Sequence, residues 1–239
     1  MRSPTKATCA TPAAARSTKP PPKRPRRTQA ERTATTRRKL IEAAIEILAE
    51  SGYGAASTTA VADRAGVSRG SIFHNFPSKA DLMLAVLDHV FEEDVKFYDQ
   101  HLEGVSSGRE YARIMSRISW EVFSGPRGIA VLQIQLGGAA DPELKPRLPK
   151  GLLQVSQRAA DSQQRRYPVG PAMKQLRTAS SRVHVAALRG LTMGLIAGEK
   201  PEDLAAELEL LQRYAQFAQD VLAPQAAARD RAEREKGET

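Results

Sequence analysis

Residues 57–76 read STTAVADRAGVSRGSIFHNF, and this stretch decides the fold because most of its positions have a geometric reason. Ser57 and Ser68 stand where a hydroxyl can accept from the unpaired N–H groups at the start of a helix. Gly66 lies between them, where a chain leaving one helix turns through positive φ without strain at Cβ. The pattern predicts a helix-turn-helix from Thr58 to Phe76.

The interior of this motif is predicted to be small and tightly packed. Ala62 is small where the two helices must cross closely, and Val61, Val67 and Ile72 are spaced to form a miniature core between them. These residues specify a relative orientation of two helices, which is more than helicity alone.

An amphipathic helix is predicted immediately before the motif. Thr28 and Glu31 have the spacing of a capping box, in which each side chain satisfies a backbone N–H at a helix start. Apolar residues then recur with the helical period, and Gly52 supplies a positive-φ stop after Ser51. The periodic apolar positions are Ile41, Ala44, Ile45 and Leu48.

The remainder of the chain is predicted to be helical as well. Pro77 breaks the chain, and Ser78 caps a longer helix with Asp81 at its third position, running to about residue 101. Further helices are expected near residues 108–124, 126–138, 142–166, 178–198 and 201–223, separated by Gly and Pro. No window alternates with period two, so the expected fold is all-α.

The stretch from Lys39 to Leu87 resembles the DNA-binding domain of the TetR family of transcriptional regulators. The resemblance rests on three segments: Glu50-Ser51-Gly52-Tyr53, Ala65-Gly66-Val67-Ser68 and Phe76-Pro77-Ser78-Lys79. It implies an N-terminal three-helix DNA-binding domain and a C-terminal helical domain for effector binding and dimerisation. The expected segments are a basic arm (1–27), a helix-turn-helix domain (28–77), an effector and dimerisation domain (78–224) and a disordered or frayed tail (225–239).

The resemblance also implies how DNA would be read. The second helix of the motif enters the major groove by its N-terminal turn, where Arg69 can bind guanine and Gly70 allows close approach. Phe73 replaces a tyrosine whose hydroxyl contacts phosphate in the family, so it is expected to pack or to meet a thymine methyl. Lys79 matches a family lysine and is the expected phosphate contact. The predicted DNA-binding residues are Thr58, Thr59, Ser68, Arg69, Gly70, Ser71, Phe73, His74, Asn75 and Lys79.

Charge is concentrated at the N-terminus. The formal net charge of the chain is +9, and residues 1–38 contain eleven Lys or Arg against one acid, whereas residues 39–101 contain five against ten. A basic, Pro-rich leader cannot bury apolar surface, so it is expected to be disordered until it meets a polyanion. Two interpretations stay open: an arm that strengthens DNA binding, or a passive solubilising tail. A likeness to a transit peptide is faint.

The last long helix carries apolar residues with alternating spacings of four and three, which is typical of a coiled coil. Glycines at residues 190, 194 and 198 precede it on one face. By resemblance, two such helices from each of two chains form a four-helix bundle in a homodimer; the alternative is packing within one domain. The predicted interface comprises Leu188, Leu191, Leu195, Leu204, Leu208, Leu211, Ala215, Ala218 and Leu222.

Aromatic and apolar residues of the intervening helices are candidates for an effector pocket, although an ordinary helical core explains them equally simply. The named candidates are Phe91, Tyr98, Tyr111, Met115, Trp120 and Phe123. Their composition favours a largely apolar small-molecule effector. The family resemblance implies that this effector releases the dimer from a palindromic double-stranded DNA operator, most simply as a repressor.

Other function classes find little support in the sequence. It contains no nucleotide-binding loop, zinc-protease motif or serine-hydrolase elbow, so we expect neither an enzyme nor a cofactor. Four histidines and the single Cys9 lack metal-ligand spacing, so no metal site is expected. No apolar run is long enough for a membrane span, and the expected location is the cytoplasm, in association with the nucleoid. The remaining alternative is a sequence-independent architectural DNA-binding protein.

Overall fold

The computed structural model describes residues 28–105, 108–166 and 168–237, and all regular structure in those ranges is helical. The prediction of an all-α fold is therefore confirmed. The basic leader and Cys9 lie outside the described residues. The elements are α1 (Gln29–Ala55), α2 (Thr58–Ala65), α3 (Arg69–Asn75), α4 (Lys79–His101), α5 (Gly108–Ser124), α6 (Pro126–Gly138), α7 (Leu148–Arg166), α8 (Pro171–Ile196), the 3-10 turn η1 (Pro201–Leu204), α9 (Ala205–Phe217), the π-helical turn η2 (Ala218–Leu222) and α10 (Ala223–Gly237).

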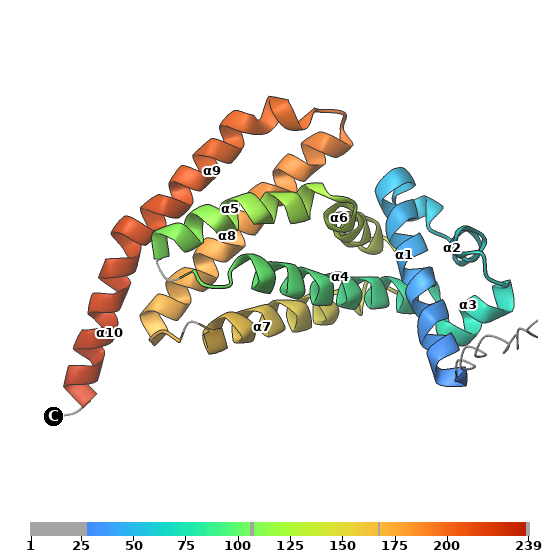
Figure 1. Ribbon diagram of the computed structural model, residues 1–239, viewed down its shortest axis with the longest axis horizontal. Coiled ribbons are helices and arrows are strands. Elements are labelled where there is room, and N and C mark those ends of the chain that lie inside the picture. Colours follow the sequence, from blue (N-terminus) through green and yellow to red (C-terminus); the bar gives the residue numbers. More distant parts are fainter. Residues whose placement is uncertain (1–27, 106–107, 167, 238–239) are drawn as a thin grey trace, which may run out of the picture.

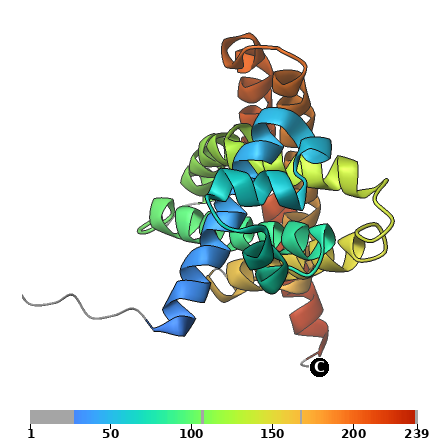
Figure 2. The ribbon, with the colours of Figure 1, turned by 90° about the vertical axis from the view of Figure 1, so that its right-hand side faces the viewer.

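The helices are divided between a small head and a larger bundle (Figure 1). α1, α2 and α3 form the head at one end of the molecule, and α4 runs from the head into the bundle. Viewed from the head, α2 and α3 lie in front of the other described helices (Figure 2). α9 and α10 continue one another along the far side of the bundle.

The head and the bundle share one hydrophobic core. Leu40 and Leu48 of α1 are completely buried, and the same cluster contains Met83 of α4 and Ile134 of α6. α1 packs most extensively against α6, which belongs to the bundle. A displacement of α6 would therefore also shift α1 in the head, because close-packed interiors transmit strain.

The predicted helix starts in the N-terminal third are confirmed. Thr28 and Glu31 form a reciprocal capping box at α1, as Ser78 and Asp81 do at α4. Gly52 has φ of 80° and interrupts the helical backbone of α1 after Ser51. The bounds of α5 and α6 also agree with the predicted ranges.

Two helices of the bundle begin elsewhere than predicted. α7 starts at Leu148 and not near residue 142, because Oδ1 of Asp141 accepts from the N–H groups of Glu143 and Leu144 and holds the chain in turns. α8 starts at Pro171 and not near residue 178, with the proline in the first helical turn, where it needs no N–H partner.

The expectation of a frayed tail is wrong for the described part of the C-terminus. α10 is helical, and its Asp230 is only 4% exposed because it accepts from the N–H groups of Ala172 and Met173 at the start of α8. Pro224 does not end the helix because the wider π-helical turn η2 precedes it, in which the N–H of Ala223 reaches the carbonyl of Ala218. Among the described residues, no helix is both long and apolar enough to cross a bilayer.

Candidate nucleic-acid interface and ligand pocket

The turn between α2 and α3 has the predicted geometry. The hydroxyl of Ser57 accepts from the N–H of Ala60 at 3.1 Å, and that of Ser68 accepts from the N–H of Ser71 at 3.2 Å. Gly66 adopts the left-handed conformation at φ 65° and ψ 37°. These three residues fix the direction in which α3 leaves α2.

α3 is anchored by one face and exposed on the other. Ile72 is completely buried, and Phe76, which follows the helix, is 1% exposed. Val61 and Ala62 of α2 are completely buried beside them, and Val67 packs half-buried against the same cluster, which confirms the miniature core. The opposite face presents four predicted DNA-binding residues to solvent: Arg69, Gly70, Phe73 and His74.

Phe73 is the most unusual residue of this surface. Its side chain is 56% exposed, although burying a phenylalanine is worth about 1.5–3 kcal/mol. It therefore does not pack into the head, which was one of its two predicted roles. A contact with a partner surface, such as a thymine methyl in the major groove, remains its predicted role.

Three other predicted contact residues use their polar groups within the protein. The hydroxyl of Ser68 caps α3, and Nδ2 of Asn75 donates to the carbonyl of Ser71 at 2.8 Å. Nζ of Lys79 donates to the carbonyl of Tyr53 at 2.7 Å and lies 3.9 Å from the centre of the Tyr53 ring. Burial lowers the pKa of Lys79. Lys79 thus makes a structural contact between α4 and α1, and the phosphate contact predicted for it stays a prediction.

The two threonines and the last serine lie at the margin of the exposed face. Thr59 is exposed, whereas Thr58 and Ser71 are half-buried. Arg37, which the sequence did not single out, donates to the carbonyl of Asn75 at 3.1 Å and covers the ring of Phe76 at 4.3 Å. It holds the end of α3 against α1, and no local pattern reveals a contact between residues 38 positions apart.

Two polar bridges reach the segment between α6 and α7, one from the head and one from the first turn of α4. The hydroxyl of Tyr53 donates to Oδ2 of Asp141 at 2.8 Å, and the guanidinium of Arg147 lies 2.7 Å from Oδ1 of Asp81. Hydrogen bonds from the backbone N–H of Leu144 and from Tyr53 lower the pKa of Asp141, and those from Arg147 and Ser78 lower the pKa of Asp81. Both carboxylates are therefore ionised partners at neutral pH.

An apolar contact reinforces the Tyr53 bridge. Gly137 of α6 lies against the ring of Tyr53 so closely that a Cβ at this position would overlap the ring. The head therefore packs closely against the last turn of α6 and donates a hydrogen bond to Asp141, which follows that helix.

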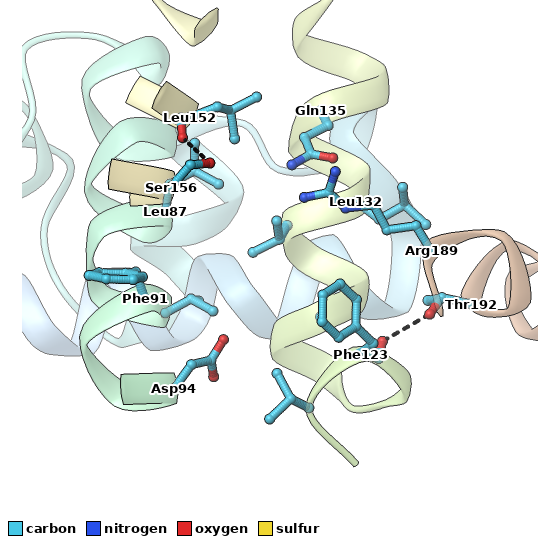
Figure 3. A pocket seen from close by; sticks show the side chains of 14 residues that line it. Leu87, Phe91, Asp94, Phe123, Leu132, Gln135, Leu152, Ser156, Arg189 and Thr192 are labelled. Carbon is cyan, nitrogen blue, oxygen red and sulfur yellow. Dashed lines mark hydrogen bonds between the residues drawn. The ribbon is translucent and has the colours of Figure 1, made fainter. Parts of the chain in front are cut away.

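A cavity of about 220 Å³ lies within the bundle, between α4, α5, α6, α7 and α8. Most of its wall is apolar, and four of its polar groups are the carboxyl of Asp94, the amide of Gln135, the guanidinium of Arg189 and the hydroxyl of Thr192 (Figure 3). The lining residues are Leu87, Val90, Phe91, Asp94, Val122, Phe123, Gly128, Val131, Leu132, Gln135, Leu152, Ser156, Arg189 and Thr192.

The structure shows which of the six aromatic and methionine candidates line the cavity. Phe91 and Phe123 line the cavity, whereas Tyr98, Tyr111, Met115 and Trp120 do not. The hydroxyl of Tyr98 lies 3.5 Å from the hydroxyl of Ser119, and that of Tyr111 accepts from Gln163. Sequence reasoning missed the polar lining residues because nothing local marks a charged residue as buried.

The acidic group of the cavity is strongly perturbed. Burial raises the pKa of Asp94 to about 7, against the opposing effect of Arg127, whose Nε lies 3.8 Å from its Oδ1. That oxygen is buried without a hydrogen-bond partner among the described residues. Asp94 is therefore present in both protonation states near neutral pH.

A second exposed surface lies on α8, α9 and η2. Leu210 is 68% exposed and Phe217 is 50% exposed, with Tyr214 and Val221 in the same helical register. Val183, Met193 and Ile196 of α8 are also exposed. These residues form an apolar face, defined here as the α8–α9 face, of a kind that marks interaction sites on soluble proteins.

The α8–α9 face differs from the predicted interface by about one residue in helical register. Leu188, Leu204 and Ala218 are buried within the single chain, and Leu191, Leu195, Leu208, Leu211, Ala215 and Leu222 are half-buried. The spacing of four and three recurs in the exposed set, at residues 210, 214, 217 and 221. The predicted stripe instead lies toward the protein's own bundle, where α9 contacts α5.

The described residues contain no group of three or more metal-ligating side chains. The head, with its tight α2–α3 turn and an α3 that is exposed on one face, has the geometry of a helix-turn-helix DNA-binding protein. The family model for bacterial regulatory proteins of the tetR family matches residues 40–86.

Similarity extends beyond the head in two comparisons. The chain is 47% identical over 68 residues to the HTH-type transcriptional regulator CymR of Pseudomonas putida, a match that spans 28% of the chain and 34% of CymR. It is 29% identical over 182 residues to the regulator UidR of Escherichia coli K12, covering 74% and 88% of the two chains. A solved structure of a TetR-family regulator from Rhodococcus sp. superposes with a TM-score of 0.56 at 17% identity, covering 76% and 99%. Residues 40–86 thus match the tetR family of bacterial regulatory proteins, and 74% of the chain is similar to an HTH-type transcriptional regulator.

Proposed function

We propose that the protein is a ligand-responsive repressor, which binds a palindromic operator as a homodimer and leaves it when an effector fills the cavity. One observation carries this proposal: the head exposes α3 and is bridged by Tyr53 to Asp141, which lies between α6 and α7, two helices that line the cavity. The exposed face of α3 and the cavity are thus connected through packed helices.

DNA reading is assigned to the exposed face of α3. Arg69 stands in the first turn, where a guanidinium reaches O6 and N7 of guanine in the major groove. Gly70 has open space around its Cα, so the helix can approach the base edges closely. Phe73 supplies an apolar contact, and His74 lies on the same side for a base or phosphate.

Dimerisation is assigned to the α8–α9 face. Its large apolar side chains are exposed in the single chain, and their register matches the seam of a helical bundle. Gly190 of α8 is exposed with open space around it, which permits a close approach of a second helix. A two-fold axis through this face gives two heads and hence two operator half-sites.

Release is assigned to movement of α6. Gln135 lines the cavity and Gly137, in the same helix, contacts Tyr53 of the head. A ligand that binds more tightly when α6 is displaced favours that conformation, and the head then moves with it. The effector weakens operator binding only by its preference for the displaced conformation.

Selection from a pool of random DNA duplexes tests the proposal. The wild-type protein should enrich an inverted repeat, and Arg69→Ala should lose about 1–3 kcal/mol of binding to the enriched sequence but not to random DNA. Exposed Arg158→Ala on α7 is the matched control and should bind like wild type. Retention of DNA without enrichment of any sequence would favour the architectural alternative.

A further inference from the structure

The cavity contains polar atoms that the protein itself leaves unsatisfied. Nε2 of Gln135 is buried without a hydrogen-bond partner among the described residues, and Oδ1 of Asp94 is buried with only the 3.8 Å ion pair to Arg127. Arg189 is half-buried in the cavity wall, and no carboxylate of the described chain pairs with it. Such groups cost about 1–3 kcal/mol each, so a native protein that retains them together in one cavity indicates a ligand.

The unsatisfied groups differ in chemistry between two parts of the cavity. In Figure 3 the side chain of Arg189 extends from α8 toward α6, which carries Gln135, whereas Asp94 lies at the opposite end of the view, below Phe91. The guanidinium and the amide NH2 are donors, and the carboxyl of Asp94 is an acceptor when it is ionised. The cavity is therefore polar at two separated places.

The donor pair fits a carboxylate. A guanidinium presents two parallel N–H groups that match the two oxygens of a carboxylate, and the amide of Gln135 adds a further donor. Among the described residues that line the cavity, Arg189 is the only cation and Asp94 is acidic, so the pocket suits one negative charge better than the two of a phosphate monoester. Burial lowers the pKa of Arg189, but a guanidinium stays protonated at neutral pH.

The wall between the polar groups restricts the body of the ligand. Phe91, Phe123 and Leu132 are among the apolar residues that line it. The volume of about 220 Å³ lies below the roughly 300–1,000 Å³ of pockets for drug-sized ligands, so the ligand is small. A hydroxyl suits the Asp94 end, since it can donate to the carboxylate or accept from the protonated acid.

We propose that the effector is a small amphipathic monocarboxylic acid, its carboxylate held by Arg189 and Gln135 and its far end carrying a hydrogen-bond donor toward Asp94. This inference rests on the proposed ligand-responsive function and sharpens the expectation of a largely apolar effector. By joining Arg189 of α8 to Gln135 of α6, the carboxylate acts on the helix that contacts Tyr53.

The test measures binding to the full-length protein by calorimetry, without DNA. The probes are phenyl-substituted and branched aliphatic monocarboxylic acids with terminal hydroxyl groups, each paired with its primary amide and with the amine of the same skeleton. At least one acid should bind more tightly than its amide and amine. Arg189→Met should weaken that acid about ten- to a hundredfold, as expected for a hydrogen-bonded charge.

Three further proteins keep the result interpretable. Arg189→Lys retains the charge without the planar fork and should bind the acid with intermediate affinity. Exposed Arg182→Met, on the same helix, should bind like wild type. Gln135→Leu should weaken the acid and leave the amine unchanged, and circular dichroism verifies that each variant is folded.

The inference is overturned if amides or amines bind as tightly as the acids, if no acid binds, or if Arg189→Met and wild type bind the acid equally. None of these results affects the outcome of operator selection, so the proposed repressor function is tested independently of the ligand. Conversely, a protein that binds the acid but enriches no DNA sequence retains the ligand assignment and loses the repressor.

Discussion

Removal of the Tyr53 hydroxyl tests the bridge between the head and the bundle most cleanly, because phenylalanine keeps the ring that Gly137 and Lys79 contact. Tyr53→Phe deletes one hydrogen bond, from the hydroxyl to Oδ2 of Asp141 at 2.8 Å. Hydrogen bonds to charged groups contribute about 1.5–3 kcal/mol, and the partial exposure of Asp141 places this one slightly below that range. We expect the free energy of unfolding to fall by about 1 kcal/mol.

A double-mutant cycle in urea denaturation isolates this interaction. Asp141→Ala removes the acceptor together with the caps of residues 143 and 144, so its own cost should be larger. In the Asp141→Ala background, Tyr53→Phe should cost almost nothing, which gives a coupling energy of about 1 kcal/mol. Equal costs of Tyr53→Phe in both backgrounds would refute the bridge. A fall in operator affinity accompanying Tyr53→Phe would further link the bridge to the position of the head.

Three further outcomes are expected. Phe73→Tyr should strengthen operator binding severalfold in fluorescence anisotropy at low salt, since it adds a hydroxyl at an exposed position, and unchanged affinity would mean that this side chain does not face phosphate. Phe217→Asp should shift the protein from dimer to monomer in analytical ultracentrifugation, while Leu153→Asp, similarly exposed on α7, should leave the dimer intact. If neither variant or both variants dissociate, the α8–α9 face is not the dimer interface. Because the pKa of Asp94 is raised, its contribution to folding stability is fully present below its unfolded pKa of about 4 and is lost as pH rises through about 7. The melting temperature of Asp94→Asn should therefore rise relative to that of wild type between about pH 5 and pH 8. Parallel curves of melting temperature against pH would contradict a buried carboxyl.

The head was predictable because its determinants are local. Ser57, Gly66 and Ser68 act within three residues of themselves, and each has the predicted conformation or hydrogen bond. The same holds for the capping boxes at α1 and α4. Cap chemistry and a positive-φ glycine depend on neighbours along the chain, so one sequence suffices to recognise them.

The pocket and the bridges were not predictable because their determinants are distant. Tyr53 meets Asp141 across 88 residues, and Arg189 reaches a cavity formed largely by four other helices. The position and charge of Lys79 predicted a phosphate contact, but its ammonium group donates to the carbonyl of Tyr53. The sequence around each residue of these pairs gives no indication of its partner.

The α8–α9 face shows a third kind of outcome. The spacing of four and three is present in α9, but two adjacent stripes satisfy it, and Leu208 and Leu211 belong to the inner one while Leu210 belongs to the outer. A shift of one residue turns a helix by about 100°, so periodicity alone does not decide which stripe faces solvent.

Footprinting on the selected operator tests the central claim most directly. If two α3 helices read one duplex through a two-fold axis, hydroxyl-radical cleavage should show two protected patches related by symmetry. Their centres should lie about one helical turn, roughly 34–36 Å, or a multiple of it apart. Arg69→Ala should lose both patches together. A single patch without symmetry, or uniform protection along the duplex, would contradict the account.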